Sequence, residues 1–369
     1  MKSSNNIVSR IIRIILLLIL IGVCVISIYF PDKKKELPKA KETLLTENFV
    51  QKFLQKEDGR IKTNITDRSN EFLSESIGLW MEYLVAKNDY VQFDEQVEIL
   101  KTYFLTKDNL VTWELQGEKK APVNALIDDL RIIDALFTAG EKWNDKGYRK
   151  LAEKMSMQLV TYQTLDNLMI DLIDLGNKHQ DTNLTLSYII PSVYKKMVKN
   201  DVLPGEIYDA TKTVLLEAPI SNVGFFPKTY HVPTKKYIYD EEINLIDQLY
   251  VGYHRVQWDG DVSHLLKFIK KAYVNSDERL YGRYDALTGK PIVQYEAPGV
   301  YALAILMCLE LEEHDFAREL YKNMKKLQQV NESSPYNGGY IDIQSKETHS
   351  FDNLLALLAE RRGIDEKIF

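Results

Sequence analysis

The stretch from Phe72 to Val85, FLSESIGLWMEYLV, carries apolar residues at the spacing of an α-helix and places one carboxylate, Glu75, among them. Burial of a carboxyl group beside residues such as Ile77 and Trp80 raises its pKa and favours the protonated form. A general acid needs that form, so Glu75 is a candidate for chemistry. The structural alternative is that Ser74 caps the helix and that Glu75 is stabilised in the first turn by the helix dipole.

The same spacing recurs in many segments, for example IDDLRIIDALFTAGEKW (127–143), EEINLIDQLYVGYHRV (241–256) and PGVYALAILMCLELEE (298–313). Continuous β-branched runs are scarce, and the pattern predicts on the order of ten to twelve helices. The fold class is therefore all-α. Paired helices without a short repeat favour a closed α/α toroid over an open solenoid, although periodicity alone does not separate the two.

The first thirty residues differ from the rest of the chain. No charged residue occurs from Ile14 to Phe30, and with the apolar residues before it this run is long enough to cross a bilayer of roughly 30 Å. No A-x-A-like cleavage site follows, and Val23 precedes Cys24 where a lipoprotein signal has a small residue. We therefore predict an uncleaved signal anchor over 1–30, a charged stalk over 31–46 and a domain over 47–369. The expected location is the cell membrane, crossed once, with the domain extracellular.

Composition excludes several functions. The net charge of −6 gives no electrostatic case for nucleic-acid binding. Cys24 and Cys308 are the only cysteines, so an intramolecular disulfide is not expected. Six scattered histidines form no H-E-x-x-H motif, and neither a metal nor a cofactor is expected.

Several stretches, in order, resemble motifs of family 8 glycoside hydrolases, the group of endoglucanases, chitosanases and xylanases. SESIGLWM (74–81) resembles S-E-G-Q-G-Y-G-M, in which the glutamate is the general acid, so Glu75 matches the acid. Trp113 followed by ALIDDLRIIDAL (125–136) resembles W-x(n)-A-T-D-x-D-L-D-I-A-x-A-L and places Asp129 at a substrate-contacting aspartate.

Two further motifs complete the set. SYIIPSVY (187–194) reproduces S-Y-x-x-P-x-x-Y and places Tyr188 at the active-site tyrosine. NLIDQLYVGYHR (244–255) lies where the family has Y-D-A-x-R, so Asp247 matches the general base, with Asp240 as the rival. A later EAPGVYALA (296–304) is similar to the family's S-P-A-x-Y-A helix start. The resemblance covers about residue 47 to the C-terminus and implies an (α/α)6 barrel.

The resemblance also implies inverting chemistry, in which one carboxyl protonates the leaving oxygen and another, roughly 6.5 to 9.5 Å away, activates water. Asp129 and Tyr188 would hold the sugar and the water, and Trp80 and Trp113 would stack on sugar rings. Each has a structural alternative: Asp128 and Asp129 as a capping pair, Tyr188 as a packed ring, and the two tryptophans as core residues.

Three departures alter the neighbours of the acid and base. Ile77 replaces a glutamine, Ile127 replaces the first aspartate of the second motif, and Tyr250 replaces the arginine three places after the base. A cellulose-like substrate is therefore not expected.

The hypothesis from sequence is a membrane-anchored, monomeric, endo-acting glycosidase. It resembles the exopolysaccharide-degrading hydrolases of Gram-positive bacteria, which implies a self-made cell-surface polysaccharide as substrate. The alternative is a catalytically inactive glycan-binding component of an exopolysaccharide assembly or export complex, which the loss of the arginine at Tyr250 favours. A helical protein-interaction scaffold is a third possibility.

Overall fold

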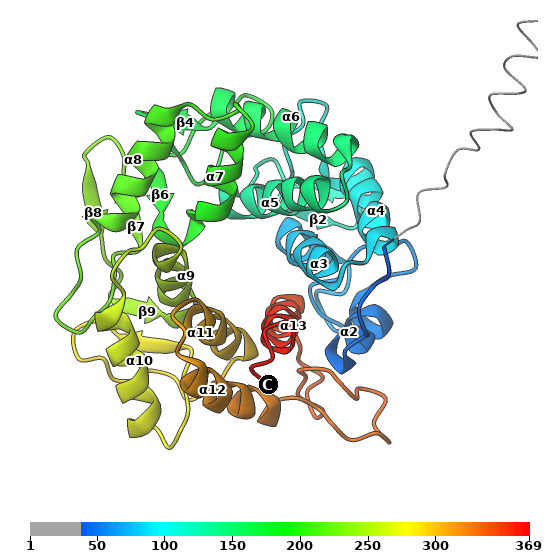
Figure 1. The fold of residues 1–369 in the computed structure, drawn as a ribbon, viewed down its shortest axis with the longest axis vertical. Helices are drawn as coiled ribbons and strands as arrows, with labels where there is room; N and C mark the ends of the chain where they lie inside the picture. Colours follow the sequence, from blue (N-terminus) through cyan, green and yellow to red (C-terminus); the bar gives the residue numbers. More distant parts are fainter. Residues whose placement is uncertain (1–37) are drawn as a thin grey trace, which may run out of the picture. The chain divides into compact units, whose positions relative to one another are not determined.

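The structure is a computed structural model that describes residues 38–369. Twelve α-helices in these residues alternate between an inner and an outer layer around a ring, consistent with the (α/α)6 barrel of the family resemblance (Figure 1). The helices are α2 (Leu45–Phe49), α3 (Ser74–Lys87), α4 (Tyr90–Ile99), α5 (Leu126–Lys142), α6 (Lys146–Tyr162), α7 (Pro191–Lys199), α8 (Gly205–Leu216), α9 (Leu245–Val256), α10 (Ser263–Asn275), α11 (Pro298–Glu310), α12 (His314–Lys326) and α13 (Ser350–Asp365). Odd-numbered helices form the inner layer, and even-numbered helices form the outer layer.

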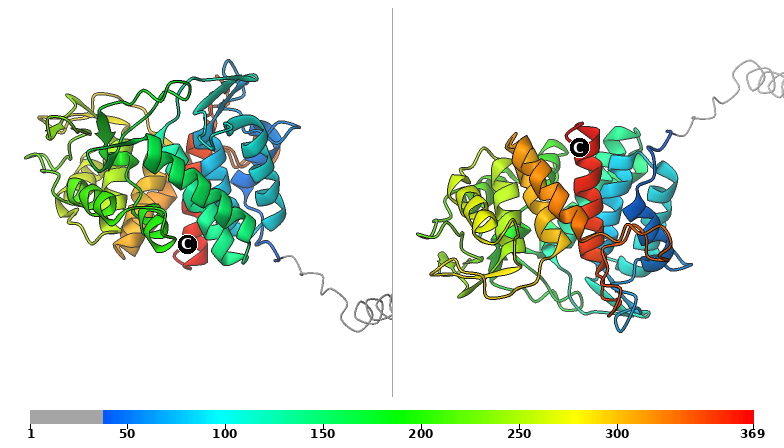
Figure 2. Two further views of the ribbon diagram at one scale, coloured as in Figure 1. Left: turned by 90° about the horizontal axis from the view of Figure 1, so that it is seen from above. Right: turned by 90° about the horizontal axis from the view of Figure 1, so that it is seen from below.

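Short strands and turns occupy the connections, which the all-α prediction did not include. The strands are β1 (Glu71–Leu73), β2 (Glu114–Gln116), β3 (Lys119–Lys120), β4 (Thr164–Leu165), β5 (Leu168–Met169), β6 (Asn183–Thr185), β7 (Thr229–His231), β8 (Lys236–Ile238), β9 (Glu242–Asn244) and β10 (Arg283–Asp285). They pair antiparallel in four small sheets, in the orders β1-β2-β3, β10-β9, β4-β5 and β6-β7-β8. Two π-helical turns, η1 (Val50–Leu54) and η2 (Leu100–Phe104), extend α2 and α4, and the 3₁₀ turn η3 (Leu186–Tyr188) precedes α7. In Figure 2 the hairpins gather at one end of the barrel and the C-terminus lies at the other.

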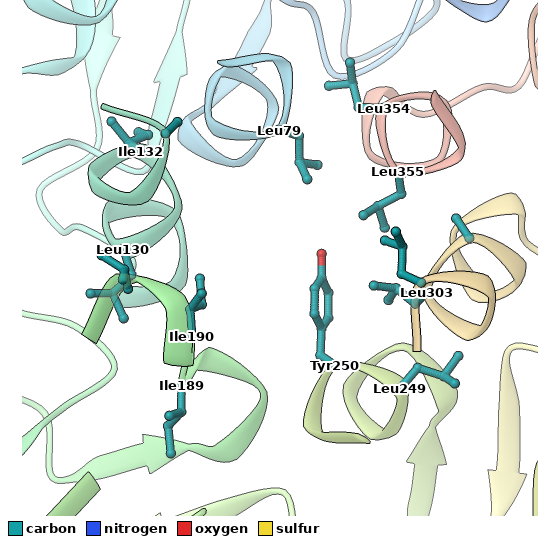
Figure 3. Packing of buried hydrophobic residues seen from close by; sticks show 14 of the residues in the cluster. Leu79, Leu130, Ile132, Ile189, Ile190, Leu249, Tyr250, Leu303, Leu354 and Leu355 are labelled. Atoms are coloured by element: carbon teal, nitrogen blue, oxygen red, sulfur yellow. The ribbon is translucent and has the colours of Figure 1, made fainter. Parts of the chain in front are cut away.

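The core fills the space between the two layers and lines the ring. Helix α11 is buried on all sides, because every residue from Gly299 to Leu309 is buried, as an all-apolar helix requires. Figure 3 shows the inner surface, where the Tyr250 phenol points toward the centre of the ring near Leu79 and Leu355.

The compact domain begins at Lys39, so residues 39–46, predicted as stalk, belong to it. Lys41 pairs with Asp365 at 2.6 Å, and Glu42 pairs with the buried Arg361 at 2.7 Å. These contacts fasten the start of the domain to the last turns of α13, which accounts for the earlier boundary. The predicted anchor over 1–30 and residues 31–37 of the stalk lie outside the described residues. Within 38–369, no helix is long and apolar enough to span a membrane.

Candidate active site

The first turns of four inner helices bring acidic side chains to the hairpin end of the barrel. Glu75 lies in the first turn of α3, Asp128 and Asp129 in that of α5, Asp247 in that of α9 and Asp352 in that of α13. Each inner helix enters the ring from the same end, so residues far apart in sequence meet there. Helix N-termini favour negative charge, which offsets part of the repulsion between these groups.

Glu75 and Asp128 form a coupled pair of carboxyl groups. The Ser74 hydroxyl donates to Asp128 at 2.7 Å, Arg131 Nη1 donates to it at 3.1 Å, and the Glu75 backbone N–H donates to it as well. Ser74 is the first residue of α3 rather than its cap. Three donors favour the ionised form of Asp128 although burial raises its pKa. Burial, and then the negative charge of Asp128, raise the pKa of Glu75 to about 8, so Glu75 keeps its proton at neutral pH.

Arg131 is the buried cation beneath this pair. Its side chain is 3 % exposed, and its Nη2 donates to the Tyr250 hydroxyl at 3.2 Å. Its Nε lies 3.8 Å from Glu82. Tyr250 stands where the resemblance expects an arginine on α9, so the cation in this chain comes from α5 instead.

Asp247 lies across the barrel mouth from α3 and is partly buried. The Ser187 hydroxyl donates to its Oδ1 at 3.1 Å, and Lys228 Nζ lies 4.0 Å from its Oδ2. Burial raises the pKa of Asp247, while Lys228 and the Ser187 hydroxyl oppose that rise. Asp240 pairs with the same Lys228 at 3.0 Å.

Tyr188 connects the two sides of the site. Burial raises the pKa of its phenol, and the charges of Asp171, Asp128, Asp247 and Glu75 raise it further. The turn η3, which carries Tyr188, packs against both α5 and α9. Asp171 accepts bonds of 2.6 Å from the backbone N–H and the hydroxyl of Thr185, and burial raises its pKa to about 6.

Two predicted substrate residues lie in the core. Trp80 has no exposed surface and stacks on Tyr83 with ring centroids 5.3 Å apart, so it offers no face to a sugar. Asp129 is 1 % exposed and accepts a hydrogen bond of 2.6 Å from Asn124. Both expectations are corrected, because each side chain points into packed protein. Trp113 is partly exposed, and its carbonyl accepts the Ser74 N–H at 2.8 Å, which places it beside Glu75.

Sequence reasoning missed five charged residues of the site: Asp128, Arg131, Asp171, Lys228 and Asp352. The aspartate in the second motif that reaches Glu75 is Asp128 rather than Asp129, one position earlier on α5. Ser74, which the sequence offered as a helix cap, instead donates its hydroxyl to Asp128, so no signal in the sequence separated the two aspartates. Asp171 and Lys228 lie in loops, where no periodicity fixes an orientation.

Within residues 38–369, no group of three His, Cys, Asp or Glu residues is arranged to hold a metal ion. A cavity of about 790 Å³ opens at the other end of the barrel, where it is lined by the later turns of the inner helices. Arg131 and Tyr250 line it and lie between it and the carboxyl pair.

Comparison with known proteins places this arrangement in context. Residues 41–237 match the family described as glycosyl hydrolases family 8. YdaJ of Bacillus subtilis, described as a candidate lipoprotein, is 41% identical over 323 residues, which is 87% of each chain.

Solved structures agree in fold. An α-amylase from Clostridium perfringens superposes with a TM-score of 0.80 at 28% identity, covering 86% of this chain and 96% of that one. PssZ from Listeria monocytogenes superposes with a TM-score of 0.73 at 25% identity, covering 89% and 98%. The family 8 endoglucanase Cel10 from Klebsiella pneumoniae, at 18% identity and a TM-score of 0.61 over 86% and 98%, shares the fold.

Proposed function

The chain belongs to glycosyl hydrolase family 8 and is a glycosidase, and from this premise we propose that it cleaves a polysaccharide internally and with inversion, using Glu75 as general acid and Asp247 as general base. The observation that carries the proposal is that Glu75 and Asp247 lie in the first turns of two inner helices at the same end of the barrel. Burial raises the pKa of Glu75 to about 8, whereas Asp247 lies 4.0 Å from the Lys228 ammonium. An inverting hydrolase needs these two protonation states on opposite sides of the scissile bond.

In this reaction Glu75 gives its proton to the glycosidic oxygen as the bond to the anomeric carbon breaks. Asp247 accepts a proton from the water whose oxygen forms the new bond to that carbon. Solvent then returns a proton to Glu75 and removes one from Asp247. We assign Tyr188 to holding the water and the sugar in line, and Trp113 to stacking on a sugar ring.

We further propose a self-made cell-surface exopolysaccharide as the substrate and the outer face of the cell membrane as the location. The apolar run over 14–30 supports a tether. The description of YdaJ as a candidate lipoprotein supports attachment to a membrane for this chain also, through the apolar run or through Cys24. An enzyme held at the cell surface acts on polymer close to the cell that makes it.

The test uses full-length protein and exopolysaccharide purified from the producing bacterium, with reducing ends measured over time. Wild-type protein is expected to release reducing ends and to lower viscosity early, as internal cleavage does. Proton NMR at early times reads the anomer formed first and decides between inversion and retention. Absence of release by wild type, with the polymer still bound, would favour the inactive glycan-binding alternative.

Three variants test the roles. Glu75→Gln and Asp247→Asn are each expected to lower the rate by about 10²- to 10⁴-fold, the usual contribution of a general acid or base. Asp240→Asn is expected to stay active, because Asp240 accepts from Lys228 at the rim of the site. Loss of activity in Asp240→Asn with activity retained in Asp247→Asn would transfer the role of base to Asp240.

A further inference from the structure

Lys228 lies between two carboxylates beside the proposed base. Its Nζ is 3.0 Å from Asp240 Oδ2 and 4.0 Å from Asp247 Oδ2. The side chain is 42% exposed, so solvent reduces its interactions but does not remove them. Lys228 is the cation nearest to Asp247 among the ion pairs of the described residues.

The backbone around Lys228 is fixed by residues of the site itself. The side-chain amide of Gln248, the residue after the proposed base, accepts the Phe226 N–H at 2.8 Å and donates to the Phe226 carbonyl at 2.9 Å. The Lys228 N–H donates to the Ile238 carbonyl at 2.9 Å, and the Lys228 carbonyl accepts the Leu186 N–H at 2.8 Å. Lys228 is therefore tied to α9, which carries Asp247, and to η3, which carries Tyr188.

Asp247 also faces groups from the neighbouring elements. Ser187 on η3 donates a hydrogen bond to it. Asp171, from the loop after β5, and Asp240, from the loop after β8, are negative charges that interact with it. Lys228 is the one positive group in this set, and Asp240 competes for it at the shorter distance.

We propose that Lys228 is a positioning residue that acts through Asp247: its ammonium keeps the general base charged, and Asp240 weakens that effect by drawing the ammonium toward itself. The inference rests on the proposed function, because it assumes that Asp247 is the base. The pair Lys228 and Asp240 then sets the lowest pH at which the enzyme works.

The sign of the effect follows from the charges. Burial raises the pKa of Asp247 and Lys228 lowers it, so removal of Lys228 moves the acidic limb of the kcat/KM profile to higher pH. An opposite charge at this distance lowers the pKa of a carboxyl group by about one unit or more. Because Lys228 is partly exposed to solvent, we expect a shift of about one unit. Removal of Asp240, whose charge raises the pKa of Asp247, moves the same limb to lower pH.

The experiment measures kcat and KM of the full-length protein across pH on the purified exopolysaccharide. Lys228→Met is expected to move the acidic limb up by about one pH unit. At a pH below the acidic limbs of both wild type and variant, kcat/KM of the variant should then be about tenfold lower. Lys228→Arg should restore the limb, and Asp240→Asn should move it down. The matched control is Lys270→Met, since Lys270 has the same 42% exposure and pairs with Glu313 at 2.7 Å on the outer layer.

The outcomes separate this inference from the proposed function. If wild type is active and Asp247→Asn is not, an unmoved limb in Lys228→Met overturns the role of Lys228 alone. A rise in KM without a shift of the limb also overturns it, because it assigns Lys228 to substrate binding. If Asp247→Asn remains active, the base assignment fails first. Opposite shifts in Lys228→Met and Asp240→Asn, with Lys270→Met unchanged, support the inference.

Discussion

Replacement of Asp128 by asparagine should move the alkaline limb of activity to lower pH. The pKa of Glu75 is raised from 4.5 to about 8 by burial and then by the negative charge of Asp128. Asparagine removes that charge and keeps the shape of the side chain. A nearby like charge raises a carboxyl pKa by about one unit, or about 1.4 kcal/mol, so the Glu75 pKa in the variant is expected near 7.

The size of the pKa shift can be measured from kcat/KM at two pH values. With a pKa of about 8 for Glu75, about a tenth of wild-type enzyme is protonated at about pH 9, compared with about a hundredth of the variant. The ratio of kcat/KM at about pH 6 to that at about pH 9 should therefore rise about tenfold. The ratio cancels any general damage, including about 2 kcal/mol of stability lost with the hydrogen bonds to Asp128.

The assay is reducing-end release across the full pH range, with thermal unfolding of each variant as a check on folding. The matched control is Asp129→Asn, which removes the neighbouring buried carboxyl group that accepts from Asn124. Burial raises the pKa of Asp129 and favours its uncharged form, so this variant should leave the alkaline limb in place. The limb belongs to the coupled pair rather than to one residue. An alkaline limb that stays at the same pH in Asp128→Asn, or moves to higher pH, refutes the assignment of the proton to Glu75 and of the negative charge to Asp128.

Three further outcomes are expected. Arg131→Met should lower the free energy of unfolding by about 3–5 kcal/mol in denaturant titrations, because it leaves the buried Asp128 without its cation; a loss below about 1 kcal/mol would contradict this. Trp113→Ala should raise KM about tenfold and leave the free energy of unfolding unchanged. Trp80→Ala should lower the free energy of unfolding by about 3–5 kcal/mol, because the core loses a fully buried ring. The reverse pattern would make Trp80 the residue that stacks on the sugar. Glu75→Gln should gain stability relative to wild type as the pH rises from 4.5 toward 8, the interval between the ordinary and the raised pKa of Glu75. In that interval the unfolded wild-type chain releases the Glu75 proton while the folded state keeps it, so wild type loses stability and the variant does not. A difference in melting temperature that stays constant with pH would argue against a raised pKa.

The helical architecture was predictable because apolar spacing repeats in nearly every segment. Helix α11 is a clear case, since its twelve residues before Glu310 carry no charge and the pattern of a helix apolar on all sides is that of a buried one. Glu75 and Asp247 were predicted as site residues from ordered motifs. The structure places both in the first turn of an inner helix at the same end of the barrel.

Orientation within a helix was harder to predict. Successive helical residues differ by about 100° around the axis, so a shift of one position separates Asp128, which reaches Glu75, from Asp129, which packs on Asn124. Helix α3 is apolar on nearly every side, and its periodicity could not tell whether Trp80 faces the site or the core. The place of Lys228 depends on hydrogen bonds from Gln248 to a loop, which no local pattern encodes.

The domain has a polarity that follows from where its first residues lie. Lys41 and Glu42 are fastened to the last turns of α13, and the Lys41 N–H donates to the Lys87 carbonyl at the end of α3. Glu75 and Asp247 occupy the opposite ends of the inner helices. The described domain therefore begins at the end of the inner helices remote from Glu75 and Asp247, so its first residues contribute no group to the candidate site.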